Sequence, residues 1–186
     1  KEIMNLCWLN KKREARTIWF VGDSHTKSLW QGIEQHAATS NLNLFTYSGG
    51  SMPFPSTKFY LIDDKTRLLK RYERFNILQN KIIEQTNKGD LVFITLRLPI
   101  YFGTEWHDEV PVSKMRFYNS DKNVFIRNSK VKHFEEWLSN LKEFSKEINE
   151  KGGNVIVSTP SPEFPRASNN GCQEQNPQWF NQLNKK

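Results

Sequence analysis

A serine and a histidine stand side by side in Gly22-Asp23-Ser24-His25, directly after a run of strand-forming residues. A serine hydroxyl is a weak nucleophile at neutral pH. It needs a base to take its proton and donors to hold the developing oxyanion. Two interpretations are open. Asp23 and Ser24 cap the start of a helix, a role that contributes about 1 kcal/mol, or Ser24 is a nucleophile held at the edge of a sheet.

Donors for such an oxyanion are present near the end of a second apolar run, where the sequence has Gly49 and Gly50. A backbone N–H at a helix start, such as that of Ser24, is free to face an anion. A glycine brings a second N–H close because it has no Cβ. The logic parallels that of the Gly-x-Ser-x-Gly elbow, although the residues differ. We therefore expect an oxyanion hole formed by the N–H groups of Ser24 and of Gly49 or Gly50.

The hydrophobic pattern of the rest of the chain alternates strands with helices. It predicts strands at residues 17–21, 42–50, 91–99 and 154–160, and amphipathic helices at residues 26–39, 66–87 and 131–150. This alternation is typical of a parallel sheet that is covered on both faces. Right-handed crossovers place the carboxyl ends of all strands at one edge, where open α/β sheets bind ligands. The sequence thus predicts one α/β domain over residues 1–186, a three-layer sandwich with a central parallel sheet.

Residues 100–130 carry no clear period and many aromatic side chains. We expect an irregular insertion here, which serves as a lid or a binding loop. Trp106 is one of the aromatic residues that would stack on a sugar ring, and His107 lies beside it next to Asp108.

Composition narrows the classes of function. The formal net charge is +7, but Lys and Arg are spread along the chain among Glu and Asp, so we expect no nucleic-acid partner. No run of about 18 apolar residues predicts a membrane span. Two cysteines, Cys7 and Cys172, would form either a disulfide or two free thiols, and no spacing indicates a zinc site.

Three segments carry a family resemblance. "FVGDSHTKSLW" resembles the first motif block of the SGNH (GDSL-like) hydrolases, and its histidine after the serine is similar to one branch of that family. That branch comprises extracytoplasmic SGNH domains fused to membrane acyltransferases (acyltransferase-3 type) of bacterial polysaccharide O-acetylation. "YSGGSMPFP" and "VIVSTPSPEFPRASNNGC" resemble later segments of the same branch.

The resemblance implies a flavodoxin-like architecture with Ser24 as the catalytic nucleophile. It also implies acyl-ester chemistry on carbohydrate without a cofactor or metal: O-acetyl transfer to a cell-surface polysaccharide, or ester hydrolysis. The acceptor would be a polysaccharide or sugar, and a membrane acyltransferase domain outside this chain would supply the acyl group. A non-catalytic polysaccharide-binding accessory domain is the other alternative.

The sequence departs from the family pattern in two places. The Asn of the third block is replaced within "TLRLP", where Arg97 would bind an anion or sugar, or form a structural salt bridge. The catalytic Asp-x-x-His occurs nowhere in the chain. We expect the chain to stop before the last strand and helix that carry this base; a domain that only binds is the alternative. Of the four histidines, His25 would shape the site and His107 is a candidate to reach it.

Overall fold

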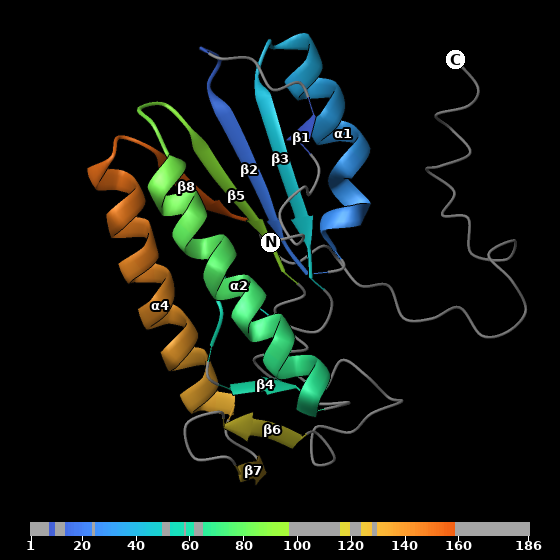
Figure 1. The fold of residues 1–186 in the computed structure, drawn as a ribbon, viewed down its shortest axis with the longest axis vertical. Coiled ribbons are helices and arrows are strands. Elements are labelled where there is room, and N and C mark those ends of the chain that lie inside the picture. Colours follow the sequence, from blue (N-terminus) through green and yellow to red (C-terminus); the bar gives the residue numbers. More distant parts are fainter. Residues whose placement is uncertain are drawn as a thin grey trace, which may run out of the picture.

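The computed structural model of the chain describes residues 8–9, 14–23, 25–49, 53–57, 59–61, 65–96, 116–119, 124–127 and 130–158. Its main element is a five-stranded sheet with the strand order β1-β3-β2-β5-β8 (Figure 1). The four strands β2, β3, β5 and β8 are parallel, and β1 pairs antiparallel with β3. The strands are β1 (Trp8–Leu9), β2 (Thr17–Gly22), β3 (Asn43–Ser48), β5 (Leu91–Thr95) and β8 (Asn154–Val157). The α/β class with a central parallel sheet is confirmed, and β1 is an addition to it.

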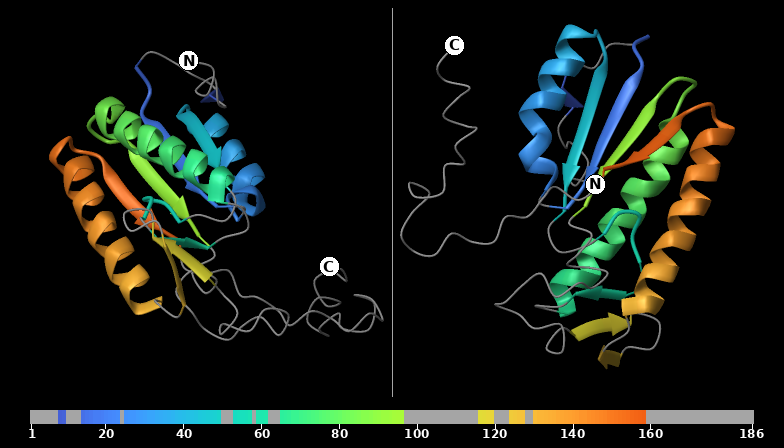
Figure 2. Two further views of the ribbon diagram at one scale, coloured as in Figure 1. Left: turned by 60° about the horizontal axis from the view of Figure 1, so that its bottom comes forward. Right: turned by 180° about the vertical axis from the view of Figure 1, so that it is seen from behind.

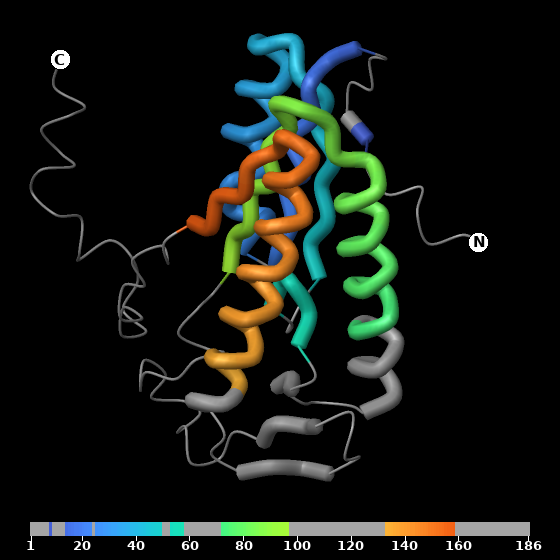
Figure 3. Tube along the Cα trace, turned by 90° about the vertical axis from the view of Figure 1, so that its left-hand side faces the viewer, coloured from blue at the N-terminus to red at the C-terminus, as the bar shows by residue number. Residues whose placement is uncertain are grey.

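Three helices cover the two faces of this sheet, namely α1 (Thr26–Thr39), α2 (Lys65–Gln85) and α4 (Lys130–Glu150). Alternation along β2 decides which side chain meets which helix, because successive residues of a strand point to opposite faces. Ile18 and Phe20 pack in a cluster with Ala37 of α1. Trp19 and Val21 pack in the larger cluster formed with α2 and α4. The three-layer arrangement is visible in Figure 2 and, with α1 and α2 on opposite sides of the strands, in Figure 3.

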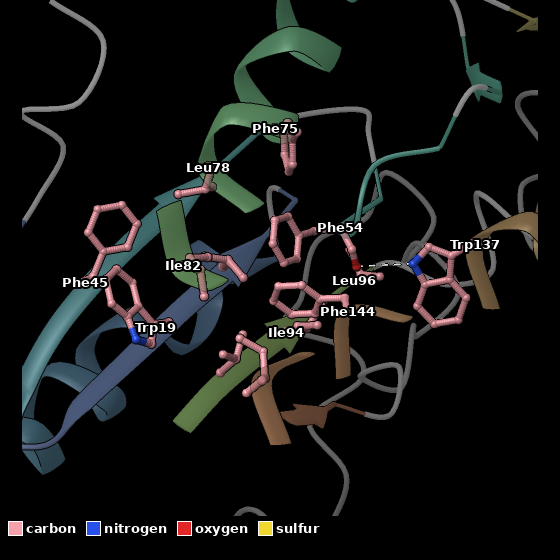
Figure 4. Packing of buried hydrophobic residues seen from close by; sticks show 13 residues of the cluster. Trp19, Phe45, Phe54, Phe75, Leu78, Ile82, Ile94, Leu96, Trp137 and Phe144 are labelled. Atoms are coloured by element: carbon pink, nitrogen blue, oxygen red, sulfur yellow. Dashed lines mark hydrogen bonds between the residues drawn. The ribbon is translucent and has the colours of Figure 1, made fainter. Parts of the chain in front are cut away.

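Phe54 connects the loop after β3 to the larger cluster. Its fully buried ring lies 5.8 Å from the ring of Phe75 in α2 and 5.4 Å from that of Phe144 in α4 (Figure 4). The indole N–H of Trp137, also in α4, donates to the carbonyl of Phe54 at 3.2 Å. One residue of this loop therefore joins the two helices that cover the same face of the sheet.

A second, antiparallel sheet has the order β4-β6-β7 and lies beyond the carboxyl ends of the parallel strands (Figure 1). Its strands are β4 (Phe59–Leu61), β6 (Arg116–Asn119) and β7 (Val124–Arg127). The irregular insertion expected at residues 100–130 contains two regular strands, β6 and β7, which corrects that prediction. Both strands are four residues long, too short for a period of two to be distinguished from an aromatic loop.

Within the described ranges, no helix is both long enough and apolar enough to cross a membrane.

Candidate active site

The carboxyl ends of β2, β3 and β5 meet at one edge of the sheet. Gly22, the last residue of β2, is in register with Ser48 of β3 on one side and with Thr95 of β5 on the other. The chain leaves β2 toward β3 through α1 and later returns past β2 to β5 through α2. The ends of β2 and β5 therefore flank the point where the connections diverge, which is where doubly wound sheets bind ligands. The Gly-Asp-Ser-His motif begins at this point.

Gly22 has no room for a side chain. A Cβ built on it would lie 1.9 Å from the carbonyl oxygen of Thr95, and its φ of 155° is a value that residues with side chains rarely adopt. The glycine therefore lets the end of β5 approach the backbone directly before the proposed nucleophile.

Asp23 is buried, with 1% of its surface exposed, and three elements hold it. Its N–H donates to the carbonyl of Thr95 at 3.2 Å. Its carbonyl accepts the hydroxyl of Ser48 at 2.8 Å and the N–H of Thr26 at 3.2 Å. Its carboxylate Oδ1 accepts the N–H of His25 at 2.8 Å. The backbone that leads into residue 24 is thereby fixed from β3, from β5 and from the start of α1.

These contacts also bear on the alternative that Asp23 only caps the start of a helix. The N-cap residue of α1 is His25, which makes no side-chain capping bond of its own. The Asp23 carboxylate instead accepts one N–H at the start of the helix, as an aspartate in a tight turn does. Asp23 thus helps to start α1, and this role is compatible with a nucleophile at the next position.

The start of α1 is held from β5 as well. Thr26 and Thr95 are both buried, and their hydroxyl oxygens lie 3.0 Å apart in a hydrogen bond. Ser48 and Thr95 lie inside the strands predicted at residues 42–50 and 91–99, and Thr26 begins a predicted helix. The sequence pattern therefore does not indicate which group each of these hydroxyls binds.

Gly49 is used differently from the sequence-based expectation. Its N–H donates to the carbonyl of Gly22 at 2.9 Å, so it continues the hydrogen bonding between β3 and β2 and does not face an oxyanion. A Cβ on this residue would lie 2.2 Å from the Phe75 ring, so close packing by α2 explains the glycine. The N–H of Gly49 is therefore already used within the sheet. Of the two glycines named as alternative oxyanion donors, Gly50 is the remaining candidate.

The loop after the glycines is tied to the helices. The side-chain amide of Asn140 in α4 donates to the carbonyl of Ser56 at 2.8 Å, and Thr57 Oγ1 lies 2.9 Å from Nε2 of His133. With the Trp137 contact to Phe54, these bonds attach residues 53–57 to α4. They hold the chain shortly after Gly49 and Gly50, at the same edge of the sheet.

The described histidines differ in their surroundings. His25, the last residue of the motif, is half-buried at the start of α1, whereas His36 is exposed near the end of that helix. His133 is fully buried and bonded to Thr57, so its place is in the packing between α4 and the loop. The remaining predicted site residues lie outside the described residues: Ser24, Gly50, Arg97, Trp106 and His107. Cys7 and Cys172 lie outside them too.

Comparison with known protein families assigns the chain to one of them. The model of the SGNH domain (fused to AT3 domains) matches residues 1–185. The chain belongs to this SGNH domain family. No curated protein and no solved structure matches it.

The SGNH assignment supports acyl-ester chemistry of the hydrolase or acyltransferase kind. It also connects this SGNH domain with AT3 domains, which are membrane domains, and so indicates a membrane-associated parent protein. The resemblance drawn from "FVGDSHTKSLW" is thereby confirmed.

Proposed function

We propose that this SGNH domain transfers O-acetyl groups to a cell-surface polysaccharide with Ser24 as the nucleophile. The observation that carries the proposal is the position of Gly22 and Asp23. They lie at the carboxyl edge of a parallel sheet, at its switch point, in a chain that belongs to the SGNH family. A serine that follows a strand end at such an edge is presented to a ligand that approaches from outside the sheet.

The proposed reaction follows from the needs of serine chemistry. The Ser24 hydroxyl attacks the carbonyl carbon of an acetyl ester and its proton passes to a base. The base returns this proton to the donor oxygen as the ester bond breaks, and the donor alcohol leaves. A sugar hydroxyl then attacks the acetyl-serine and takes the acetyl group; water in its place gives the esterase reaction. The N–H groups of Ser24 and Gly50 would stabilise the oxyanion in both steps. An Asp-x-x-His, which these 186 residues do not contain, is the base that we expect.

We further propose that the domain acts on the extracytoplasmic side, tethered to a membrane acyltransferase domain that supplies the acetyl group. The support is the family description, in which the SGNH domain is fused to AT3 domains. The exposed sugar chains of a cell surface are then within reach of the site. Arg97, Trp106 and His107 follow the end of β5 in sequence and are the candidates to contact the acceptor.

The test is Ser24→Ala in the longest natural chain that contains this domain, with a chromogenic acetate ester and, separately, an acetylated sugar donor with a polysaccharide acceptor. We expect a fall in kcat of at least about 1,000-fold, because the nucleophile is removed. Ser28→Ala is the matched control, since Ser28 lies in the first turn of α1 and is exposed. Turnover that survives Ser24→Ala would reject the proposal, and polysaccharide binding without any turnover in the wild type would favour an accessory binding domain.

A further inference from the structure

Two hydroxyl groups from the strands on either side of β2 bond to the chain before and after residue 24, one to a backbone carbonyl and the other to a side chain. Ser48, at the end of β3, donates to the carbonyl of Asp23 at 2.8 Å. Thr95, at the end of β5, bonds through its hydroxyl to that of Thr26 at 3.0 Å. Residue 24 lies between the two bonded residues of this turn, one position after Asp23 and two positions before Thr26.

The pairing of the strands does not account for these side-chain bonds. Gly22 carries the last pair of the register in both ladders, with Ser48 and with Thr95. The Asp23 carbonyl already accepts the N–H of Thr26, so the Ser48 hydroxyl is a second donor to the same oxygen. Thr26 and Thr95 are both nearly inaccessible to solvent, so water cannot replace either hydroxyl in their bond. These side-chain bonds therefore restrict the turn in addition to the backbone hydrogen bonds of the sheet and of the helix start.

A nucleophile needs such constraint. Effective catalysis requires the attacking atom to be held close to its reacting geometry, and a displacement of about 1 Å costs about 100-fold in rate. If the turn between β2 and α1 had backbone hydrogen bonds only, its middle residue would move whenever the strand or the helix moved. Bonds from β3 and β5 on both sides of the turn limit that movement.

We propose that Ser48 and Thr95 are positioning residues for Ser24. Their hydroxyl groups limit the movement of the turn between β2 and α1 through hydrogen bonds. The proposal rests on the proposed function, because it needs Ser24 as the nucleophile. Neither residue touches the reacting atoms in this proposal. Ser48 acts through the carbonyl of Asp23, and Thr95 acts through the hydroxyl of Thr26.

The experiment compares Ser48→Ala and Thr95→Val with the wild type in the same natural chain. We expect kcat for the chromogenic acetate ester to fall about 10-fold in each variant, with KM within about 2-fold, because the nucleophile is misplaced while the binding surface stays. The second readout is the rate at which an organophosphonate labels Ser24, which reports on the attack by this serine without the later transfer step and should fall in proportion to kcat. Thr95→Ser keeps the hydroxyl and should restore both readouts to within about 3-fold of the wild type.

A matched control separates positioning from stability. Thr86 is also buried, and its hydroxyl donates to the carbonyl of Ile82 at 2.7 Å, at the carboxyl end of α2 away from the site. Thr86→Val removes a buried hydroxyl bond of the same kind, so the midpoint of thermal unfolding should fall while kcat and labelling stay within about 2-fold.

The outcomes are distinguishable from those that test the proposed function. A wild type without turnover or labelling, or a Ser24→Ala variant that keeps both, rejects the function itself. An inactive Ser24→Ala variant combined with wild-type kcat and labelling in Ser48→Ala and Thr95→Val overturns the positioning proposal alone. Equal losses of kcat in Thr86→Val would overturn it too, since the effect would then follow stability and not place.

Discussion

At the scale of single residues, Gly22 shows how one missing side chain shapes the candidate site. The end of β5 packs so closely on it that a methyl group would lie 1.9 Å from the Thr95 carbonyl oxygen. That carbonyl also accepts the N–H of Asp23, so it cannot move away without loss of this bond. The first residue of the motif is therefore a glycine for a packing reason, whatever chemistry follows it.

Gly22→Ala should destabilise the protein by at least about 2 kcal/mol, because both an unfavourable φ and an overlap with backbone atoms must be relieved. Urea denaturation followed by tryptophan fluorescence measures this free energy of unfolding. We expect esterase activity to be lost as well, even below the unfolding transition, since the relief moves the turn at residues 23–26.

Gly32→Ala is the control for that measurement. Gly32 lies inside α1, and a Cβ on it would meet no atom within 4 Å. Alanine favours the helix over glycine by about 0.5–1 kcal/mol, so this variant should be more stable than the wild type. A Gly22→Ala variant that is as stable as the Gly32→Ala variant would show that the close approach of β5 is absent in solution.

At the scale of elements, the sequence predicts the helices best. The apolar residues of α1, α2 and α4 recur at helical spacing over 14 to 21 residues, and the predicted bounds agree with the structure within two residues. The strands predicted at residues 42–50 and 91–99 end earlier than expected, at Ser48 and Thr95. Apolar residues such as Leu96 continue beyond the last ladder pair, so hydrophobicity alone does not mark where pairing stops.

The site was predictable only in part. The order of strands and helices, together with the motif, indicates that Gly22 and Asp23 lie at the carboxyl edge, because parallel strands end together. The partner of the Gly49 N–H and the hydroxyl contacts of Ser48 and Thr95 depend on how three strands and two helices pack in space. These contacts join residues 25 to 69 positions apart. They also lie at strand ends, where the hydrophobic pattern does not say toward which face a side chain points.

The loop at residues 53–57 offers a test at this scale. Trp137→Phe removes the indole N–H that donates to the Phe54 carbonyl and keeps most of the ring in the core. The buried carbonyl loses a donor, so we expect a loss of about 1–2 kcal/mol in the free energy of unfolding. Hydrogen exchange should also become faster at Ser56 and Thr57, the residues that follow in the loop.

Trp30→Phe provides the comparison. Its indole N–H also donates a hydrogen bond, to Glu34 at 3.1 Å within α1, but the pair is partly exposed to water. Water can replace that bond, so the loss should be about 0.5 kcal/mol or less. Equal losses in the two variants would contradict the view that the Trp137 bond holds the loop to α4.

At the scale of the whole molecule, the two faces of the sheet are covered unequally. Two long helices, α2 and α4, pack on the face that carries Trp19, Phe45 and Ile94. On the other face, α1 packs on β2 and β3, and within the described residues no helix lies over β5 and β8. A groove lined by Ile33 of α1, by Phe93 and by Ile156 runs along this part of the sheet.

The unequal cover predicts different costs for the same substitution in neighbouring strands. Ile94 in β5 is fully buried beneath α2 and α4, whereas Ile156 in β8 pairs with Phe93 on the opposite face and is 49% exposed. Ile94→Ala should cost about 2–5 kcal/mol, since it leaves a cavity in a closely packed cluster. Ile156→Ala should cost about 1 kcal/mol or less, because half of its side chain already faces water.

Urea denaturation measures the loss in free energy of unfolding for both variants. The measurement is made in the 186-residue chain and again in the longest natural chain that contains it. A small cost for Ile156→Ala in the short chain that rises above about 2 kcal/mol in the longer one would show that added polypeptide covers β8, as parallel strands require on both faces. A cost that stays small in both would show that the α1 side of β8 faces solvent in the whole protein. A cost for Ile156→Ala in the short chain equal to that for Ile94→Ala would contradict the unequal cover itself.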